Sequence, residues 1–310
     1  MKILLQFPEG LKQQALKFVE KYESQGHTIY LSSSRSFGGC DVAFEEADSI
    51  GAEKIVHFGH CKFPIHSFFQ KRFSNIKVEY IEYEVPIKDE FLIEIVKYAE
   101  EKKFKKVGLI LTVQHICILD SLIKKLSEKE IEVFVGKGAK TVYPGQVLGC
   151  DTSSILSFID KVDSIIFIGG GRFHYLAIHK NLEPYKVPIV SANPYTLEIK
   201  EINEEIGQYV KQRKGLIAQA SEAETFGIIV STRAGQFAIE TAESIKKKLN
   251  EKGKNAEILV SRTVDAEALQ DFNLFDAYIN TSCPRLADDW KTIGKPVVNS
   301  NEIEILFSFL

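Results

Sequence analysis

Three cysteines occupy comparable places in the sequence and could together hold a metal. Cys40 and Cys150 each lie in a Gly-Cys-Asp tripeptide, and Cys283 directly follows a predicted strand at residues 276–282. The chain has five cysteines but no Cys-x-x-Cys pair, so the common local zinc and ferredoxin signatures are absent. Three thiolates that converge suit a soft metal or an iron–sulfur cluster. The alternative is three unrelated buried thiols, because free cysteine is often buried.

The other two cysteines fit this pattern less well. Cys117 lies at an expected helix start between two isoleucines, so we expect its thiol in the core. Cys61 follows His57 and His60 and precedes His66, a composition that a zinc site could use. Residues 57 and 60 of one strand should point to opposite faces, however, which disfavours zinc. We expect His60 to line a pocket instead.

Further polar residues follow predicted strands. Gly170 lies in a glycine run after an apolar strand, where a bare backbone allows close approach of a ligand, although a tight turn explains it equally well. The segment 231–236 ends another strand and is expected to open a helix, whose free N–H groups could bind an anion. An ordinary helix N-cap is the alternative there. The candidate cofactor-binding residues are His60, Gly170, Ser231, Arg233, Gln236 and Arg285.

The elements that must position these residues repeat along the chain. Apolar runs that begin at residues 2, 107 and 226 are each followed by an amphipathic helix and a second apolar run. Strands that alternate with helices predict βαβ units and parallel sheets, whose ligands collect outside the carboxyl ends of the strands. The chain is also equally long from Cys40 to Gly59 and from Cys150 to Gly169, which predicts a structural duplication.

The predicted fold class is therefore α/β, with three similar small parallel-sheet domains in a pseudo-threefold arrangement. We place them at residues 1–103, 104–214 and 215–310, so that each contains one of the three cysteines. If the strand ends of all three domains face inward, Cys40, Cys150 and Cys283 converge on one point.

Composition limits the partners. The chain has 310 residues, 45% of them hydrophobic, and a net charge of −3. This charge gives no global basic field to attract nucleic acid or an anionic membrane. No apolar stretch is long enough to span a membrane, and Pro8 and Glu9 end the first apolar run too early for a signal peptide. We therefore expect a cytoplasmic protein with reduced cysteines.

Taken together, the motifs resemble those of a known family. From about residue 6 to 290, and in the same order, they are similar to the archaeal diphthamide synthases, the 2-(3-amino-3-carboxypropyl)histidine synthase family. The motifs that carry the resemblance are Gln6-Phe7-Pro8-Glu9-Gly10-Leu11, Phe37-Gly38-Gly39-Cys40-Asp41-Val42-Ala43, His57-Phe58-Gly59-His60, Pro144-Gly145-Gln146-Val147-Leu148-Gly149-Cys150, Gly170-Gly171-Arg172-Phe173-His174 and Cys283-Pro284-Arg285-Leu286-Ala287.

The resemblance implies a [4Fe–4S] cluster held by Cys40, Cys150 and Cys283, with one iron open to S-adenosylmethionine. One electron would cleave the bond between sulfur and the γ-carbon, and the 3-amino-3-carboxypropyl radical would add to a histidine ring carbon of translation elongation factor 2. This is the first step of diphthamide biosynthesis. The resemblance also implies a homodimer and an unidentified electron donor. Arg285, Arg233 and Gln236 are candidates for the clamp on the amino-carboxylate end of the cofactor, by position and polarity alone.

Two alternatives stay open. A quinolinate-synthase-like [4Fe–4S] dehydratase is also built from three small α/β domains around three cysteines, although the cysteine contexts here do not match it. A non-catalytic iron–sulfur partner subunit is the second, and three intact cysteines argue against it. Unlike the usual radical enzymes that use S-adenosylmethionine, the chain has no run of three closely spaced cysteines.

Overall fold

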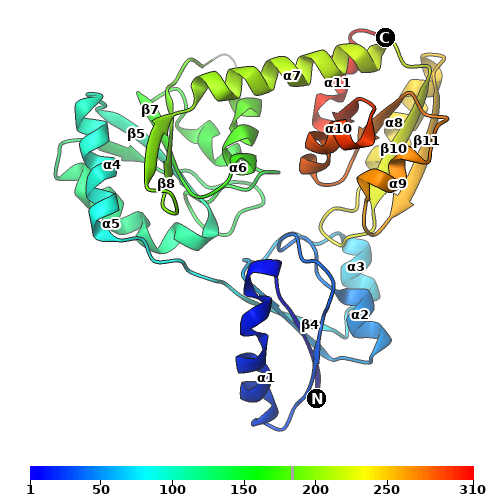
Figure 1. The fold of residues 1–310 in the computed structure, drawn as a ribbon, viewed down its shortest axis with the longest axis horizontal. Coiled ribbons are helices and arrows are strands. Elements are labelled where there is room, and N and C mark those ends of the chain that lie inside the picture. The colour runs from blue at the N-terminus through cyan, green and yellow to red at the C-terminus, as the bar shows by residue number, and fades with distance from the viewer. Residues whose placement is uncertain (183–184) are drawn as a thin grey trace. The chain divides into compact units, whose positions relative to one another are not determined.

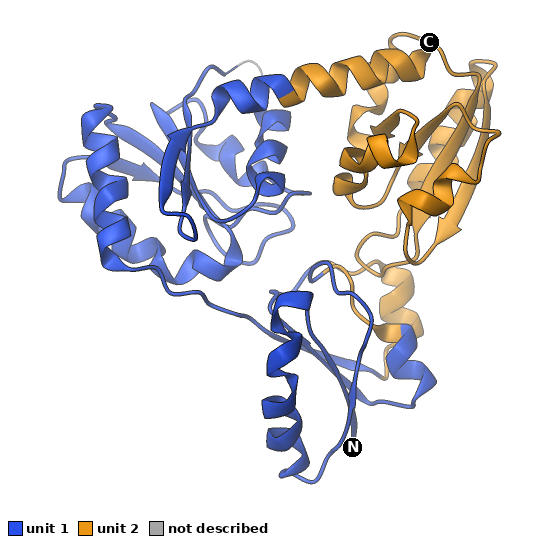
Figure 2. Cartoon of the chain, viewed as in Figure 1, with its two compact units in different colours: residues 1–39, 45–63, 76–208 blue, residues 40–44, 64–75, 209–310 orange. Residues whose placement is uncertain are grey.

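The computed structural model describes residues 1–182 and 185–310, which form two compact units. Figure 2 shows unit 1, residues 1–39, 45–63 and 76–208, in blue and unit 2, residues 40–44, 64–75 and 209–310, in orange. Each unit is described by itself. Over the described residues the strand orders are β2-β1-β3-β4 and β6-β5-β7-β8-β9 in unit 1, and β11-β10-β12-β13 in unit 2.

In the first sheet, the central strand β1 pairs in parallel with β2 and β3, so that Leu4 lies opposite Tyr30 and Ile55. The predicted amphipathic helix packs Ala15 and Tyr22 on one face of this sheet (Figure 1). It begins as a 3-10 turn directly after Pro8. The elements of this part of the chain are β1 (Lys2–Gln6), η1 (Glu9–Gln14), α1 (Ala15–Glu23), β2 (Thr28–Leu31), α2 (Phe44–Ser49), β3 (Lys54–Phe58), α3 (Ser67–Arg72) and β4 (Lys77–Ile81).

The second sheet is covered on one face by α4 and α5, whose apolar side chains pack on β5 and β7 (Figure 1). All five residues of β7 are buried, as expected for a parallel strand covered on both faces. Strand β9 adds an antiparallel edge that the sequence pattern does not predict. The elements are α4 (Asp89–Glu101), β5 (Lys106–Leu111), η2 (Val113–Ile118), α5 (Leu119–Ser127), β6 (Glu132–Phe134), η3 (Ser153–Ser157), β7 (Ser164–Ile168), α6 (Arg172–Leu176), η4 (Ala177–Asn181), β8 (Ile189–Asn193) and β9 (Glu198–Glu201).

The third sheet forms the body of unit 2, with the long buried strand β10 at its centre. Helix α8 packs on it through Ala242, Ile245 and Leu249, the spacing that the sequence predicts. The elements are α7 (Asn203–Ser221), β10 (Thr225–Ser231), α8 (Ile239–Glu251), β11 (Asn255–Ser261), α9 (Ala266–Gln270), β12 (Ala277–Asn280), η5 (Pro284–Asp289), α10 (Trp290–Ile293), β13 (Val297–Asn299), η6 (Ser300–Glu302) and α11 (Ile303–Phe307).

The shared strand order confirms the predicted fold class of three similar parallel-sheet α/β parts. In each sheet the first strand along the chain lies between the second and the third. Strands β3 and β7 end at Phe58 and Ile168, one residue before the two glycines of the predicted duplication. Each of the ranges 1–103, 104–214 and 215–310 contains one sheet, and these domain boundaries stay a prediction.

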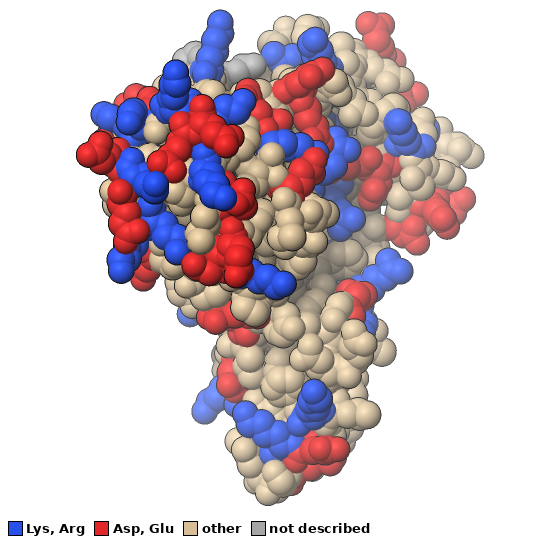
Figure 3. Space-filling model, turned by 60° about the vertical axis from the view of Figure 1, so that its left-hand side comes forward, with Lys and Arg blue, Asp and Glu red and all other residues tan. Residues whose placement is uncertain are grey.

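Charged side chains of both signs are interspersed on the face that Figure 3 shows. Ion pairs on α4 and α5 join Lys97 to Glu94 at 2.6 Å and Lys125 to Asp89 at 3.0 Å. Within residues 1–182 and 185–310, no helix is both long and apolar enough to cross a bilayer.

A buried ion pair in unit 2 connects helix α7 to the third sheet. Arg213 of α7 is 3% exposed and donates from Nε and Nη2 to the carboxylate of Glu302, at 2.9 and 2.6 Å. Its Nη2 also donates to the carbonyl oxygen of Val297 at 2.7 Å. Glu302 in turn accepts the backbone N–H of Asn299 at 2.8 Å. One charged pair therefore ties α7 to the end of β13.

We expect Arg213→Met to lower the free energy of unfolding by about 3–5 kcal/mol, because it leaves the Glu302 carboxylate buried without its partner. Lys247→Ala is the control: its ion pair with Glu251 is exposed on both sides, and such pairs contribute about 0–1 kcal/mol. Urea denaturation of the two variants and the parent chain measures the difference. Equal stabilities for the two variants would contradict this role of the pair.

Candidate functional site

The aspartate of each Gly-Cys-Asp tripeptide anchors its cysteine loop. In unit 1, Asp151 is 8% exposed and accepts the backbone N–H of Ser153 at 3.0 Å and of Lys140 at 2.5 Å. The loop that carries Cys150 also returns to the carboxyl end of β5, where Leu111 bridges Gln146. Because Asp151 is turned inward, Cys150 is left partly exposed at the edge of the sheet.

In unit 2, the corresponding carboxylate forms an ion-pair cluster. Asp41 is 1% exposed, and its two oxygens lie 3.2 Å from Nε of Arg233 and 3.4 Å from Nη2 of Arg262. The backbone N–H of Gly235 donates to the carbonyl oxygen of Cys40 at 2.8 Å. These contacts fasten the Cys40 loop to the loop that follows β10, so residues far apart in sequence meet at the carboxyl end of the third sheet.

The glycine of each tripeptide is required by close packing. A Cβ atom built on Gly39 would collide with the carbonyl oxygen of Cys61, and one built on Gly149 would collide with the ring of Phe173. Both contacts lie within unit 1. The duplicated tripeptide thus has three separate tasks: the glycine allows a close approach, the aspartate anchors the loop, and the cysteine stays available at the edge.

Cys283 is held by an asparagine instead of an aspartate. It lies three residues after the end of β12 and precedes η5. Asn280, which is 1% exposed, donates to the carbonyl oxygen of Cys283 at 2.8 Å and accepts from the backbone N–H of Ser282 at 3.0 Å. Asn280 also donates to Asn299 at 2.8 Å, which links this loop to the neighbouring strand. The aspartates are visible in the repeated tripeptide, but the sequence pattern does not predict that these residues or Asn280 anchor the loops.

Two of the three candidate cysteines belong to unit 2, and both sulfurs accept N–H hydrogen bonds. Gln236 donates from Nε2 to Sγ of Cys40 at 3.2 Å, and the backbone N–H of Arg285 donates to the sulfur of Cys283. Burial raises the pKa of the Cys283 thiol, while that N–H and the charges of Arg233 and Arg285 oppose the rise. Arg233 therefore contacts Asp41 and also lies near Cys283.

Cys150 belongs to unit 1. Within either unit, the described residues contain no group of three His, Cys, Asp or Glu side chains that could hold a metal ion. A site built from all three cysteines needs residues from both units, and this set of ligands stays a prediction.

The expected helix N-terminus at residues 231–236 is wrong. Helix α8 begins only at Ile239, and residues 232–238 form a loop with a turn at residues 234–236. Ser231 is fully buried, accepts from the backbone N–H of Arg233 at 3.2 Å and donates to the carbonyl oxygen of Arg262 at 3.3 Å. Its hydroxyl therefore serves the loop, and the geometry gives no support to a ligand role for Ser231.

His57 and His60 lie in direct contact, so the argument that they point to opposite faces is wrong. Strand β3 ends at Phe58, and Gly59 turns the chain with φ of +83°. His57 donates from Nδ1 to Gln6 Oε1 at 2.9 Å, and its Nε2 lies 2.9 Å from His60 Nδ1. Burial lowers the pKa of His57 to about 3 and of His60 to about 4, so both rings are neutral at pH 7. This pairing uses both ring nitrogens of His57, which leaves it no lone pair for zinc.

The remaining cysteines also differ from expectation. Cys117 is exposed on η2, so the prediction of a core thiol there is wrong. Cys61 is the buried one, and Gln146 donates from Nε2 to its sulfur at 2.9 Å. Cys61 therefore packs at the contact between the loops of the first two sheets, within unit 1.

Two further candidates have mixed outcomes. Gly170 lies against the ring of Tyr195, which a Cβ atom would meet, so a larger residue there would have to displace that ring. Arg285 is exposed beside Cys283 and is free to reach a ligand carboxylate. Both ligand roles stay predictions.

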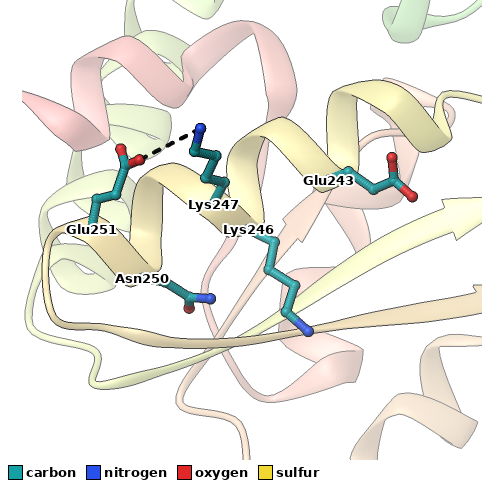
Figure 4. Close-up of a pocket in the computed structure, with 5 residues that line it drawn as sticks. All are labelled: Glu243, Lys246, Lys247, Asn250 and Glu251. Carbon is teal, nitrogen blue, oxygen red and sulfur yellow. Dashed lines mark ion pairs between the residues drawn. The ribbon is translucent and has the colours of Figure 1, made fainter.

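A surface hollow on α8 does not belong to this site. It is lined by charged and polar side chains of residues 243–251 of the helix, where Lys247 pairs with Glu251 at 3.9 Å (Figure 4). A helix in a βαβ unit runs back from the carboxyl edge of the sheet, so these residues approach the opposite edge from Cys283. The lining residues are Glu243, Lys246, Lys247, Asn250 and Glu251.

The motifs and the loops that carry them agree with a known family. The family model described as "Putative diphthamide synthesis protein" matches residues 7–309. The chain belongs to this diphthamide synthesis family.

Members of this family resemble the chain over its whole length. A Pyrococcus horikoshii protein named 2-(3-amino-3-carboxypropyl)histidine synthase is 32% identical, over 98% of this chain and 85% of its own. Subunit 1 of the same synthase from Nematostella vectensis is 28% identical, and the match covers 98% of this chain and 63% of that protein. The crystal structure of Dph2 from Pyrococcus horikoshii with a 4Fe-4S cluster superposes with a TM-score of 0.84 at 29% identity, covering 100% of this chain and 86% of that one.

We expect Gly39→Ala to lower the free energy of unfolding by about 1–3 kcal/mol, because the new methyl group meets a backbone carbonyl that cannot turn away. Gly10→Ala is the matched control, since a Cβ atom there meets nothing within 4 Å. Chemical denaturation measures both variants. A Gly39→Ala protein as stable as Gly10→Ala would show that this close approach is dispensable.

We expect stability to fall as the pH is lowered from about 6.5 towards 4, because histidines of the unfolded chain take up protons in this range while the buried His57 and His60 do not. Each such group contributes a slope of up to about 1.4 kcal/mol per pH unit. His60→Gln should therefore reduce the slope by up to that amount between pH 6.5 and 4. Denaturation midpoints at several pH values measure it, and an unchanged slope would exclude His60 as a contributor.

Proposed function

We propose that the protein transfers the 3-amino-3-carboxypropyl group of S-adenosylmethionine to a histidine ring carbon of a protein substrate, the first step of diphthamide biosynthesis. The observation that carries the proposal is the position of Cys40, Cys150 and Cys283 in anchored loops at strand ends, within a chain that matches the family over residues 7–309. The names of the relatives support the synthase over the quinolinate-synthase-like alternative and over a purely supporting subunit.

The residues present fit a [4Fe–4S] cluster. All three candidate cysteines are partly exposed, whereas Cys61 is buried among protein atoms. Thiolates are the ligands that such clusters require, and N–H donors to the sulfurs stabilise their negative charge. Cys40 and Cys283 already accept such bonds, and Arg233 and Arg285 add positive charge beside Cys283. Three cysteines would leave one of four irons without a protein ligand and open to substrate.

When bound, the cluster supplies the electron that cleaves the bond between the sulfur and the γ-carbon of S-adenosylmethionine. The protein's own task is to hold the substrate so that this bond, and not the bond to the adenosyl carbon, faces the reactive iron. Arg285 is exposed beside Cys283 and suits the carboxylate of the methionine part. The Asp41–Arg233 pair fixes the Cys40 loop, so that one side of the site keeps its shape.

A carbon radical suits the proposed acceptor. The imidazole carbon between two nitrogens is a poor nucleophile, so ordinary alkylation would modify a nitrogen instead. The radical route avoids this competition if water and oxygen are kept out. We propose translation elongation factor 2 as the protein substrate, a homodimer as the active form and a separate electron donor, in the cytoplasm, all of which rest on the family resemblance.

The direct test is the reaction itself. Anaerobic, reduced protein should convert S-adenosylmethionine to methylthioadenosine and modify elongation factor 2 of an organism that makes diphthamide. Formation of quinolinate from iminoaspartate and dihydroxyacetone phosphate, without methylthioadenosine, would instead support the dehydratase. A protein that binds a cluster and shows neither activity would support the partner-subunit alternative.

We expect Cys40→Ala, Cys150→Ala and Cys283→Ala each to lose the visible absorbance of the cluster, because each removes one thiolate ligand. Cys117→Ala, at an exposed position on η2, should keep it. Iron and sulfide content after anaerobic reconstitution measures the result. A full cluster in any of the first three variants would remove that residue from the ligand set.

A further inference from the structure

Gln236 contacts the Cys40 sulfur through the nitrogen of its side-chain amide. Its Nε2 is 3.2 Å from Sγ, and its backbone N–H donates to the carbonyl oxygen of Arg233 at 2.9 Å. Gly235, one residue earlier, donates to the backbone of Cys40. A thiolate can only accept hydrogen bonds, so an amide that meets it must present its nitrogen. The loop that contains Gln236 therefore holds the backbone of Cys40, and the side chain of Gln236 contacts its sulfur.

The same orientation leaves the other end of the amide without a partner. Oε1 of Gln236 is buried and accepts no hydrogen bond from any described residue. A buried carbonyl oxygen without a donor is rare in folded proteins. The charged neighbours cannot easily supply one, because Arg233 and Arg262 are held by the Asp41 carboxylate. The oxygen is therefore available for a donor that arrives with a ligand.

The amino-carboxypropyl end of S-adenosylmethionine carries two groups with opposite hydrogen-bonding properties. Its carboxylate only accepts hydrogen bonds and suits an arginine, whereas its ammonium group only donates. A neutral amide oxygen is a suitable acceptor for an ammonium group, and unlike a carboxylate it adds no negative charge beside a cluster that is itself negative. The chemistry of Oε1 thus selects the ammonium end of the substrate.

We propose that Gln236 is a positioning residue with two contacts: its amide N–H bonds the Cys40 sulfur of the cluster, and its amide oxygen receives the ammonium group of S-adenosylmethionine. This inference rests on the proposed function, in which Cys40 is a ligand. A hydrogen bond to a ligand sulfur withdraws electron density and raises the reduction potential of the cluster. One side chain thereby sets both the ease of cluster reduction and the position of the substrate's amino group.

Gln236→Leu tests both contacts in the anaerobically reconstituted, full-length protein. A redox titration followed by electron paramagnetic resonance should give a more negative cluster potential than in the parent chain. Affinity for S-adenosylmethionine should fall roughly tenfold, the effect of losing one hydrogen bond to a charged group. Binding of methylthioadenosine, which lacks the ammonium group, should be unchanged. An unchanged potential or an unchanged affinity for S-adenosylmethionine, with the cluster intact, overturns the proposal.

Gln236→Glu separates the two contacts, because a carboxylate still accepts from an ammonium group but has no N–H for the sulfur. We expect the potential to fall while affinity for S-adenosylmethionine is kept. A parent-like potential in this variant also overturns the proposal. Should Gln236→Leu assemble no cluster, Gln236→Glu, which has the same shape as the native side chain, provides the potential measurement.

The chain offers a matched control at a sulfur outside the proposed ligand set. Gln146 donates from Nε2 to Cys61 at 2.9 Å, and its Oε1 accepts from the backbone N–H of Val142 at 2.9 Å. Gln146→Glu removes this N–H to sulfur bond and keeps the acceptor, and Cys61→Ser removes the sulfur instead. Both should leave the potential unchanged, and a shift as large as that of Gln236→Leu would overturn the assignment. Retention of the cluster in Cys40→Ala, by contrast, would refute Cys40 as a ligand in the proposed function. It would not refute the binding of the ammonium group by Gln236.

Discussion

The arrangement around Cys40 depends on the ion pairs that the Asp41 carboxylate forms with Arg233 and Arg262. A buried charge is stable only when it is paired, and Asp41, at 1% exposure, is paired with two arginines from the third sheet's loops. Within unit 2, this requirement fixes residues 40–44 against the loops of the third sheet, and it thereby places Cys40 beside the side chain of Gln236. The site is therefore ordered by one ion-pair cluster, and the cysteine itself can stay accessible.

The repeat of Gly-Cys-Asp shows how one loop design can be fixed in different ways. Asp151 satisfies backbone N–H groups of its own loop, whereas Asp41 pairs with side chains from a distant segment. Asn280 anchors the Cys283 loop by donating from its side-chain amide to the carbonyl oxygen of Cys283. In all three cases the anchoring side chain is buried, whereas the cysteine residue that it holds is partly exposed.

The sequence predicted the sheets well because burial dictates their pattern. The apolar runs at β1, β5 and β10 and the spacing of Ala242, Ile245 and Leu249 needed no tertiary information. Several errors arose where the chain leaves a strand. Periodicity does not predict that Gly59, with its positive φ, lets His60 contact His57, nor that seven residues separate β10 from the start of α8. The partner of Asp41 could not be predicted either, since nothing local distinguishes Arg233 from other arginines.

The order in which the chain is made gives the Asp41 cluster a further consequence. Arg262 lies 221 residues beyond Asp41, so a growing chain carries the aspartate long before either of its partners leaves the ribosome. Until then the carboxylate must remain hydrated, because it cannot be buried alone. The Cys40 loop is thus among the last segments to become fixed. A cluster that used Cys40 as a ligand would be assembled only after the nearly complete chain had closed around that aspartate.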